Sequence, residues 1–461
     1  MKTLVVERDG RITVHEVNKP RYNEYQALVK TIACGMCGTD IKLIHRTFKG
    51  FPESVYPIML GHEGVGEVVE VGSKVKGLKV GDKVLLPFVD PDPENLPGLG
   101  SGWGALSEYA VVCDPKAPWP GGAPDCAFAQ TVLDDDLDPV DATMIVTFRE
   151  VLSNIRYFGI QPQDSVVVFG CGPVGLTYLK FMSLLGVKDL VACDILPEKL
   201  EQARNYGATH LINSKECDVR AEVRKLFPGG VDYVLDAAGS PAIVNQGMGL
   251  IKDRGSVLCY GVPEKEEVTI DFSPADYNWR VIYQQMPRKR EEGEAHAQVV
   301  EWMRSGELNI KDFISDYFTF DQAVEAYQKL LDRNSGILTG TVNEQLTRYP
   351  GVTYIGRFNF GGHNLDLFCV DEEYEDENGQ SAKFFPATSV EITAPSCGHL
   401  MYGQITQMDY GQTDFTSYVA KRVPKLIVDQ PNDLRKLRYA CRPLAAPKNY
   451  TPWIYMESVI D

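Results

Sequence analysis

The chain has 461 residues, 44% of them hydrophobic and 24% charged, which is the ordinary composition of a globular protein with more than one core. Its 63 acidic residues outnumber its 46 lysines and arginines, and the resulting net charge of −17 argues against nucleic acid or a membrane surface as a partner. No apolar run reaches the ~18 residues of a transmembrane helix, and the charged N-terminus, MKTLVVERDGRITV, indicates a pair of strands rather than a secretory signal.

The 11 cysteines are an odd number scattered along a long chain, which predicts reduced thiols in the cytoplasm rather than a disulfide framework. Most are expected to be small buried side chains. Seven have no partner at metal-ligand spacing: Cys126, Cys193, Cys217, Cys259, Cys369, Cys397 and Cys441.

Residues 1–145 are strand-like, because short β-branched runs such as TLVVE and GEVVEVG alternate with turn residues. An antiparallel, barrel-like domain is expected there. Over residues 146–289, apolar strands alternate with helical stretches, which predicts a doubly wound parallel sheet. Residues 290–343 contain two helical segments and the strand GILTGTV.

The segment SVVVFGCGPVGLTYLKF places Gly170, Gly172 and Gly175 directly between a strand and a helix. In this G-x-G-x-x-G pattern the first glycine permits a tight turn, the second lets the backbone approach a pyrophosphate, and the third lets helix and strand pack closely. Pro173 and Val174 open the helix, whose N-terminus attracts the diphosphate. A dinucleotide site is therefore predicted.

The next strand, DLVACD, ends in Asp194. A carboxylate at this position accepts the hydroxyls of an adenosine ribose and repels a 2′-phosphate, so NAD is expected rather than NADP. Lys199, one helical turn further on, is a second candidate for contact with the ribose.

The first domain contains ACGMCGTD, with Cys37, Thr39 and Asp40, and LGHEGVGEVVEVGSKV, with His62 and Glu63. Thiol and imidazole are ligands that zinc prefers, and a hydroxyl two residues past a ligand can pass on a proton. The acids are suited to orienting the ligands. Taken alone, Cys37 and His62 make only half a metal site.

The G-H-E-x-x-G-x-x-x-x-x-G-x-x-V pattern from Gly61 to Val75 resembles the signature of the zinc-type medium-chain dehydrogenases, which include sorbitol, threonine and alcohol dehydrogenases. The resemblance covers residues 1–343. It implies an α/β fold in which a GroES-like β-barrel catalytic domain, residues 1–145 completed by 290–343, accompanies an NAD-binding Rossmann domain, residues 146–289.

The resemblance also implies roles for individual residues. Cys37 and His62 would be catalytic zinc ligands, Glu63 an adjacent acid able to approach the metal, and Thr39 the start of a proton relay with His45 as a later member. The implied activity is hydride transfer between a small alcohol or polyol and NAD, assisted by one zinc ion per chain.

The sequence departs from the family pattern in two places. The stretch PFVDPDPENLPGLGSGWGALSEYAVV lacks the four cysteines that bind a structural zinc in many relatives, so no structural zinc is expected. The position of the third catalytic ligand, 24 residues before Gly170, is Val146. Glu150, four residues on and on the same helical face, is one substitute; Glu63 with water is another, and a weak or absent metal is the third possibility.

Residues 345–461 have no place in a dehydrogenase and are expected to form a small α+β region. They resemble the C-terminal part of the major capsid protein E family of tailed phages, through the strand pair around Asn378-Gly379, the Tyr402-Gly403 step and Arg442-Pro443-Leu444.

Two other functions stay open at this point: a zinc-free reductase of the same fold, and a structural phage protein acting through the C-terminal region. A dimer or tetramer is expected unless the C-terminal region blocks it, with the segment Val257–Pro263 as the edge strand that pairs between subunits.

Overall fold

The computed structural model describes residues 1–263, 269–331 and 340–343, and then the strands that lie between residues 352 and 454. It divides into two compact units, Met1–Glu344 and Gln345–Asp461. Among the described residues, no helix is both long and apolar enough to cross a bilayer.

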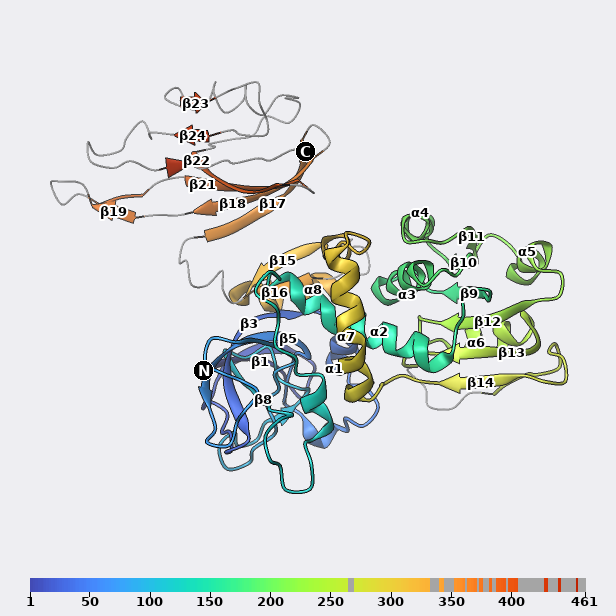
Figure 1. Ribbon diagram of the computed structural model, residues 1–461, viewed down its shortest axis with the longest axis horizontal. Coiled ribbons are helices and arrows are strands. Elements are labelled where there is room, and N and C mark those ends of the chain that lie inside the picture. Colours follow the sequence, from blue (N-terminus) through green and yellow to red (C-terminus); the bar gives the residue numbers. More distant parts are fainter. Residues whose placement is uncertain are drawn as a thin grey trace. The chain divides into compact units, whose positions relative to one another are not determined.

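Two β-sheets of the first unit form the predicted antiparallel barrel-like part (Figure 1). The smaller sheet has the order β2-β1-β4-β7, and its strands are β1 (Lys2–Val6), β2 (Ile12–Glu16), β4 (Ile58–Met59) and β7 (Gly100–Ser101). The larger has the order β15-β16-β3-β5-β6, with β8 also paired to β3. Its strands are β3 (Gln26–Gly35), β5 (Glu63–Val71), β6 (Lys83–Leu85), β8 (Tyr109–Cys113), β15 (Asp316–Thr319) and β16 (Gly340–Asn343).

The larger sheet joins the two ends of the first unit. The described part of the predicted strand GILTGTV, from Gly340 on, lies in β16, which pairs antiparallel with β3, and β15 pairs parallel with β16. Residues 336–339 of that prediction lie outside the described residues. The chain after residue 290 thus returns to complete the sheet that carries Cys34 and Gly35. The helix α8 (Ala323–Leu331) follows β15 and contacts α1 (Gly38–Ile44).

The second half of the unit is the predicted doubly wound sheet, with the order β11-β10-β9-β12-β13-β14 and parallel pairing throughout. Its strands are β9 (Ser165–Phe169), β10 (Asp189–Asp194), β11 (His210–Asn213), β12 (Val231–Asp236), β13 (Ile251–Cys259) and β14 (Arg280–Tyr283). Its helices are α3 (Pro173–Leu184), α4 (Pro197–Asn205), α5 (Val219–Leu226) and α6 (Pro241–Met248).

Alternation along β9 shows how this sheet is covered on both faces. Val166 and Val168 belong to the cluster that includes the buried side chains of α3 and α4. Val167 and Phe169 belong to the cluster that includes those of α5 and α6. Because successive side chains of a strand point to opposite faces, a continuous apolar run is what a parallel strand between two helical layers requires.

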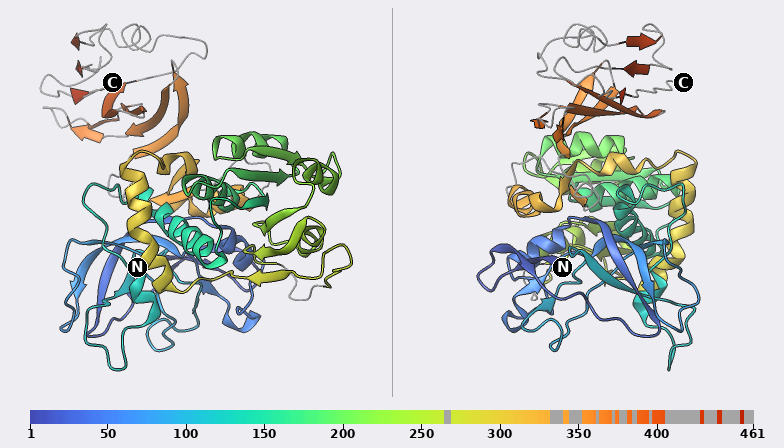
Figure 2. Two further views of the ribbon diagram at one scale, coloured as in Figure 1. Left: turned by 45° about the vertical axis from the view of Figure 1, so that its right-hand side comes forward. Right: turned by 90° about the vertical axis from the view of Figure 1, so that its left-hand side faces the viewer.

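The helices α2 (Met144–Phe158) and α7 (Lys289–Arg304) pack against each other between the barrel sheets and the parallel sheet, as Figures 1 and 2 show. The helix α2 ends at Gly159, whose φ of 75° provides the left-handed C-terminal residue common at helix ends. Buried side chains of α2 and α7 join those of the parallel sheet in one cluster.

The edge-strand prediction for Val257–Pro263 is wrong, because β13 pairs with β12 on one side and with β14 on the other. The edge of the sheet is β14. The segment 280–283 shows no alternating pattern, because the strand is short and only partly buried.

In the second unit, every described element is a strand, so the helices of the expected α+β region do not fall within its described residues. Strands β17 (Val352–Phe360), β18 (His363–Val370), β21 (Ala387–Ala394) and β22 (Cys397–Gln404) form an antiparallel sheet. The short strands β19 (Glu373–Glu375) and β20 (Ser381–Lys383) pair on either side of Asn378-Gly379, and β23 (Ile427–Asp429), β24 (Arg438–Ala440) and β25 (Trp453–Ile454) form a third sheet.

We predict that Gly293→Ala destabilises the first unit. A Cβ at this position of α7 would lie 2.1 Å from the carbonyl oxygen of Phe128, so the helix must move away from its neighbour. Overpacking costs about 1–3 kcal/mol, more than the gain of up to about 1 kcal/mol in helix propensity. Urea titration should show a lower midpoint of unfolding. Gly229→Ala, which meets nothing within 4 Å, is the matched control, and equal midpoints for the two variants would contradict the prediction.

Candidate active site and metal centre

Cys37 lies at the N-terminal cap of α1, directly after β3. Its backbone N–H donates to Asp40 Oδ2 at 3.0 Å, and the hydroxyl of Tyr327 on α8 donates to the same oxygen at 2.7 Å. Asp40 is fully buried, so these hydrogen bonds are what make burial of its carboxylate tolerable. The returning segment of the chain thus fixes the turn that presents the thiol.

His62 and Glu63 lie at the start of β5, after a turn that only glycine fits. Gly61 has a φ of 100°, and a Cβ there would lie 2.6 Å from the backbone nitrogen of Leu106. The Nδ1 atom of His62 lies 3.4 Å from Asp40 Oδ1. Asp40 therefore holds the cysteine turn and lies beside the imidazole, and its role as an acid that orients metal ligands stays a prediction.

The carboxylate of Glu63 is only 5% exposed and points toward α2, where the hydroxyl of Thr147 donates to Oε1 at 2.5 Å. Gly35 of β3 makes room for the carboxylate, because a Cβ on Gly35 would lie 2.4 Å from Glu63 Oε2. The strand β5, the helix α2 and Gly35 therefore set the position of the Glu63 carboxylate.

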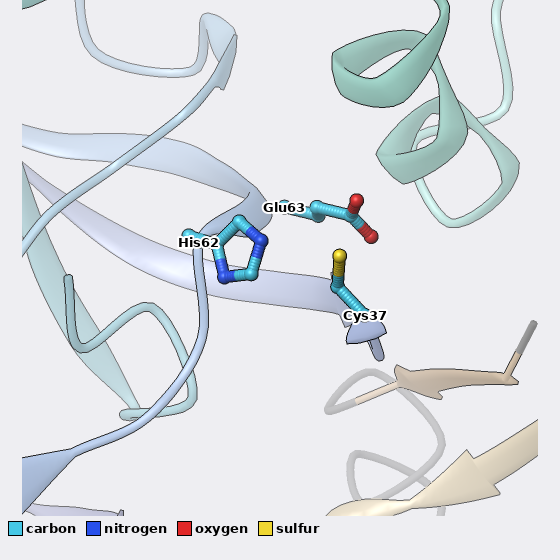
Figure 3. A group of neighbouring side chains, drawn as sticks. All are labelled: Cys37, His62 and Glu63. Atoms are coloured by element: carbon cyan, nitrogen blue, oxygen red, sulfur yellow. The ribbon is translucent and has the colours of Figure 1, made fainter. Parts of the chain in front are cut away.

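Cys37, His62 and Glu63 converge, and one ligand atom from each lies within 4.8 Å of the others. Figure 3 shows the thiol, the imidazole and the carboxylate pointing toward one another. Thiolate, imidazole nitrogen and carboxylate oxygen are all zinc ligands, and three protein ligands with one open position is the arrangement of catalytic zinc sites. The donor set therefore fits zinc.

The surroundings of this group favour protonated side chains until a cation binds. Burial lowers the pKa of His62, but the neighbouring Cys37 and Asp40 outweigh burial and raise that pKa well above its usual range. Burial raises the pKa of the Cys37 thiol, and the nearby Glu63 carboxylate raises it further. Burial also raises the pKa of Glu63, while His62 and the Thr147 hydrogen bond oppose that shift. Since metal ligands must lose their protons, binding should release protons and grow stronger as pH rises.

Glu150, the sequence candidate for a third ligand, lies near this group but not within it. Its Oε1 accepts a hydrogen bond from Tyr260 at 2.5 Å, and burial raises the pKa of its carboxyl. Val146 lines the same pocket, and the hydroxyl of Thr147 donates a hydrogen bond to Glu63. The structure gathers Glu63, rather than Glu150, with Cys37 and His62.

The group opens into a pocket of about 230 Å³ between the barrel and the parallel sheet. Thr39 lines this pocket, as does Trp103, whose ring centroid is 5.1 Å from that of His62. Trp103 has a φ of 70°, which is rare for a large side chain and is found most often where function requires a fixed orientation. The volume suits a small substrate.

Several residues of this pocket were missed by sequence reasoning. Lys42, one turn after Thr39 on α1, lines it, whereas His45 is exposed at the end of that helix and is not in its lining. Tyr260 and Lys289 also line it. The helical spacing of Thr39 and Lys42 was a usable signal, but the contributions of Tyr260 and Lys289 depend on how distant segments pack.

The predicted dinucleotide turn lies between β9 and α3. Gly170 has a φ of 93°, and a Cβ on Gly175 would lie 1.8 Å from the Gly170 carbonyl oxygen. A Cβ on Gly172 would meet nothing within 4 Å, which leaves open space for a phosphate group beside the backbone. Pro173 is the first residue of α3, and Val174 lines the pocket at the metal group.

Asp194 ends β10 beside this turn. Its Oδ2 accepts from the backbone N–H of Cys171 at 2.7 Å, and its Oδ1 accepts from those of Ile195 and Leu196. The carboxylate therefore ties the glycine turn to the next strand, and Oδ2, which accepts one hydrogen bond, keeps a lone pair for a further donor. Lys199 is half-buried on α4.

A second hollow of about 800 Å³ adjoins the pocket and shares Phe48, Gly261, Val262 and Gln285 with it. Asp236 and Tyr283, at the carboxyl ends of β12 and β14, line this hollow. Ligands of open parallel sheets bind at the carboxyl ends of the strands, and an extended cofactor would have room here.

Comparison with known proteins places these features in one family. Residues 23–119 match the family model described as alcohol dehydrogenase GroES-like domain, and residues 173–299 match the model described as zinc-binding dehydrogenase. The NADP-dependent isopropanol dehydrogenase of Clostridium beijerinckii is 33% identical over 261 residues, covering 52% of this chain and 70% of that protein. The chain belongs to the zinc-binding alcohol dehydrogenase family.

Other members of the zinc-binding alcohol dehydrogenase family resemble the whole first unit. Sorbitol dehydrogenase of Bacillus subtilis is 26% identical over 343 residues, covering 72% of this chain and 94% of that protein. The structure of the alcohol dehydrogenase TADH from Thermus sp. ATN1 superposes with a TM-score of 0.59 at 27% identity, covering 74% of this chain and 99% of the other. Membership makes this chain an NAD(P)-dependent oxidoreductase that acts on small molecules.

Residues 311–457 match a further family model, phage major capsid protein E. The match confirms the resemblance drawn from the C-terminal sequence. It begins before the boundary between the two compact units, since residues 311–343 include β15, α8 and β16 of the dehydrogenase unit.

We predict that Thr147→Val weakens zinc binding by about 10- to 100-fold, the usual effect of removing a hydrogen bond that orients a metal ligand. The valine has the shape of threonine but cannot donate to Glu63. Zinc affinity is measured by competition with a chromophoric chelator at constant pH. Thr147→Ser keeps the hydroxyl and should bind within about threefold of the wild type, and equal losses in both variants would contradict a role for the hydrogen bond.

Proposed function

We propose that this chain catalyses reversible hydride transfer between a small polyol and NAD, with zinc bound by Cys37, His62 and Glu63. The observation that supports this most strongly is the convergence of those three ligand atoms within 4.8 Å, with Cys37 and His62 lining a small pocket that Val174 of α3 also lines. Glu150 is proposed as a nearby acid that approaches the metal when the coordination changes.

In this proposal the chain's own residues position the substrate and move its proton. When bound, zinc supplies a Lewis acid that lowers the pKa of an alcohol hydroxyl. The Thr39 hydroxyl accepts the substrate proton, and Lys42, three residues on along the same helical face, is the next polar side chain in the pocket. His45, at the exposed end of α1, would be the last member toward solvent.

The cofactor proposal is NAD rather than NADP. The turn at Gly170, Gly172 and Gly175, with Pro173 and Val174 at the start of α3, would hold the diphosphate. Asp194 would accept a ribose hydroxyl with the remaining lone pair of Oδ2 and would repel a 2′-phosphate, and Lys199 would lie at the edge of the same site. When bound, the dinucleotide supplies the hydride acceptor.

A polyol is favoured over a simple apolar alcohol because the pocket wall includes the charged side chains Lys42, Glu150 and Lys289 beside the aromatic Phe48 and Trp103. Several hydroxyl groups of one substrate can form hydrogen bonds with such side chains, which the carbon chain of an apolar alcohol cannot do. The similarity to sorbitol dehydrogenase supports the same choice.

We assign residues 1–145, completed by about 290–343, to the catalytic domain, residues 146–289 to NAD binding, and residues 345–461 to a capsid-like extension. A homodimer or homotetramer is proposed, with β14 as the edge strand between subunits. A cytoplasmic location is proposed, because none of the cysteines that the structure describes is in a disulfide.

The capsid match supports a second candidate, in which residues 345–461 bring the chain into a protein shell. Particles in electron micrographs of the purified full chain would favour that candidate. A zinc-free reductase of the same fold is the third, and metal analysis of active protein separates it from the first.

We predict that the full chain reduces NAD with polyols, that NADP serves less well at equal concentration, and that His62→Ala abolishes zinc-dependent turnover. Metal stabilisation of charge is worth several kcal/mol, so kcat/KM should fall by about 100-fold or more. Absorbance at the NADH band measures the rate. The control His15→Ala, outside the pocket on β2, should have a kcat/KM within about twofold of the wild-type value. A His62→Ala enzyme with wild-type kcat/KM would contradict the proposal.

A further inference from the structure

Two cysteines outside the catalytic pocket lie against each other. Cys113 is the last residue of β8, and Cys126 lies in the short 3-10 helix Asp125–Phe128. The Cys126 thiol donates to the sulfur of Cys113, and the two Sγ atoms are 4.0 Å apart. The sequence spacing did not indicate this contact, which forms because the 12 intervening residues fold back on β8.

The pair combines a reachable thiol with a fixed one. Cys126 is half-buried, whereas Cys113 is 7% exposed. Cys113 is held in place, because its backbone N–H donates to Gln130 Oε1 at 2.7 Å and its sulfur accepts from Gln26 Nε2 at 3.5 Å. The hydrogen bond from Cys126 lowers the pKa of Cys113 and raises the pKa of Cys126, so Cys113 loses its proton more readily than Cys126.

We propose that Cys113 and Cys126 form a redox-active dithiol that closes to a disulfide when the chain meets hydrogen peroxide. One of the two sulfurs, as a thiolate, attacks one peroxide oxygen, the O–O bond breaks, and that cysteine becomes a sulfenic acid with release of water. The other sulfur then attacks the sulfenic sulfur, forming the S–S bond and releasing a second water molecule. The two thiols lose two electrons and two protons, and one peroxide is reduced to two waters.

The connecting segment can accommodate closure. A disulfide bond is about 2 Å long, so the sulfurs must approach by about 2 Å. Gly121 and Gly122, between the two cysteines, have φ values of 88° and 100° with open space around both, and they can change conformation without a side-chain clash.

Closure of the disulfide would affect the catalytic pocket through the 3-10 helix Asp125–Phe128. Asp125 Oδ2 accepts from the backbone N–H of Lys289 at 2.8 Å, and the guanidinium of Arg290 lies 3.6 Å from the ring centroid of Phe128. Lys289 begins α7 and lines the catalytic pocket. Oxidation at this pair would therefore act on the helix that carries a pocket residue.

The test is peptide mapping of the full chain after treatment with hydrogen peroxide, with remaining thiols blocked by N-ethylmaleimide and digestion without reductant. We expect a peptide pair linking Cys113 to Cys126, about 2 Da lighter than the two thiol peptides and separated again by dithiothreitol. Cys113→Ser and Cys126→Ser should each lose it, and Cys217→Ser, which removes an exposed cysteine elsewhere, should keep it.

Full labelling of both cysteines by N-ethylmaleimide after peroxide would overturn the proposal, as would recovery of Cys126 as sulfinic acid with no link. Mapping reads a covalent bond and does not depend on turnover, so it succeeds or fails independently of the proposed dehydrogenase activity.

Discussion

The hydrogen bond between the Thr147 hydroxyl and the buried Glu63 carboxylate joins the two halves of the dehydrogenase unit at the site of its chemistry. Glu63 is the first residue of β5, and Thr147 lies in the first turn of α2. A carboxylate that is 5% exposed is costly unless it is paired, and here its neighbours are a hydroxyl, an imidazole and a thiol. A cation among those groups would relieve the burial cost of the acid, which is why the same residues that bring the halves together also favour metal binding.

The surrounding polar groups extend this arrangement in two directions. Asp40 holds the cysteine turn and lies beside His62, and it is itself fixed by Tyr327 from the returning end of the chain. On the cofactor side, Asp194 fixes the glycine turn through the backbone of Cys171. Each acid satisfies backbone or side-chain donors first, so the pocket is held in shape before substrate or cofactor arrives.

Sequence patterns predicted those elements of the fold whose signal is a local alternation or spacing of residues. The strand–glycine turn–helix around Gly170 is found as expected, as is a strand at the described end of GILTGTV, because each signal lies in a few consecutive residues. The features that the sequence did not predict depend on contacts between distant segments. The short edge strand β14 has no distinctive pattern, Tyr260 meets Glu150 across 110 positions, and Cys126 meets Cys113 only because a loop folds back. The choice between Glu63 and Glu150 likewise required knowing which carboxylate the packing of β5 on α2 turns toward Cys37.

The most direct test of the central claim is the zinc content of the purified full chain, measured by inductively coupled plasma mass spectrometry together with turnover before and after chelation. With no structural site expected, the account predicts about one zinc ion per chain, loss of NAD-linked polyol oxidation on chelation, and recovery on adding back one equivalent. Full activity in protein that contains no zinc would contradict it.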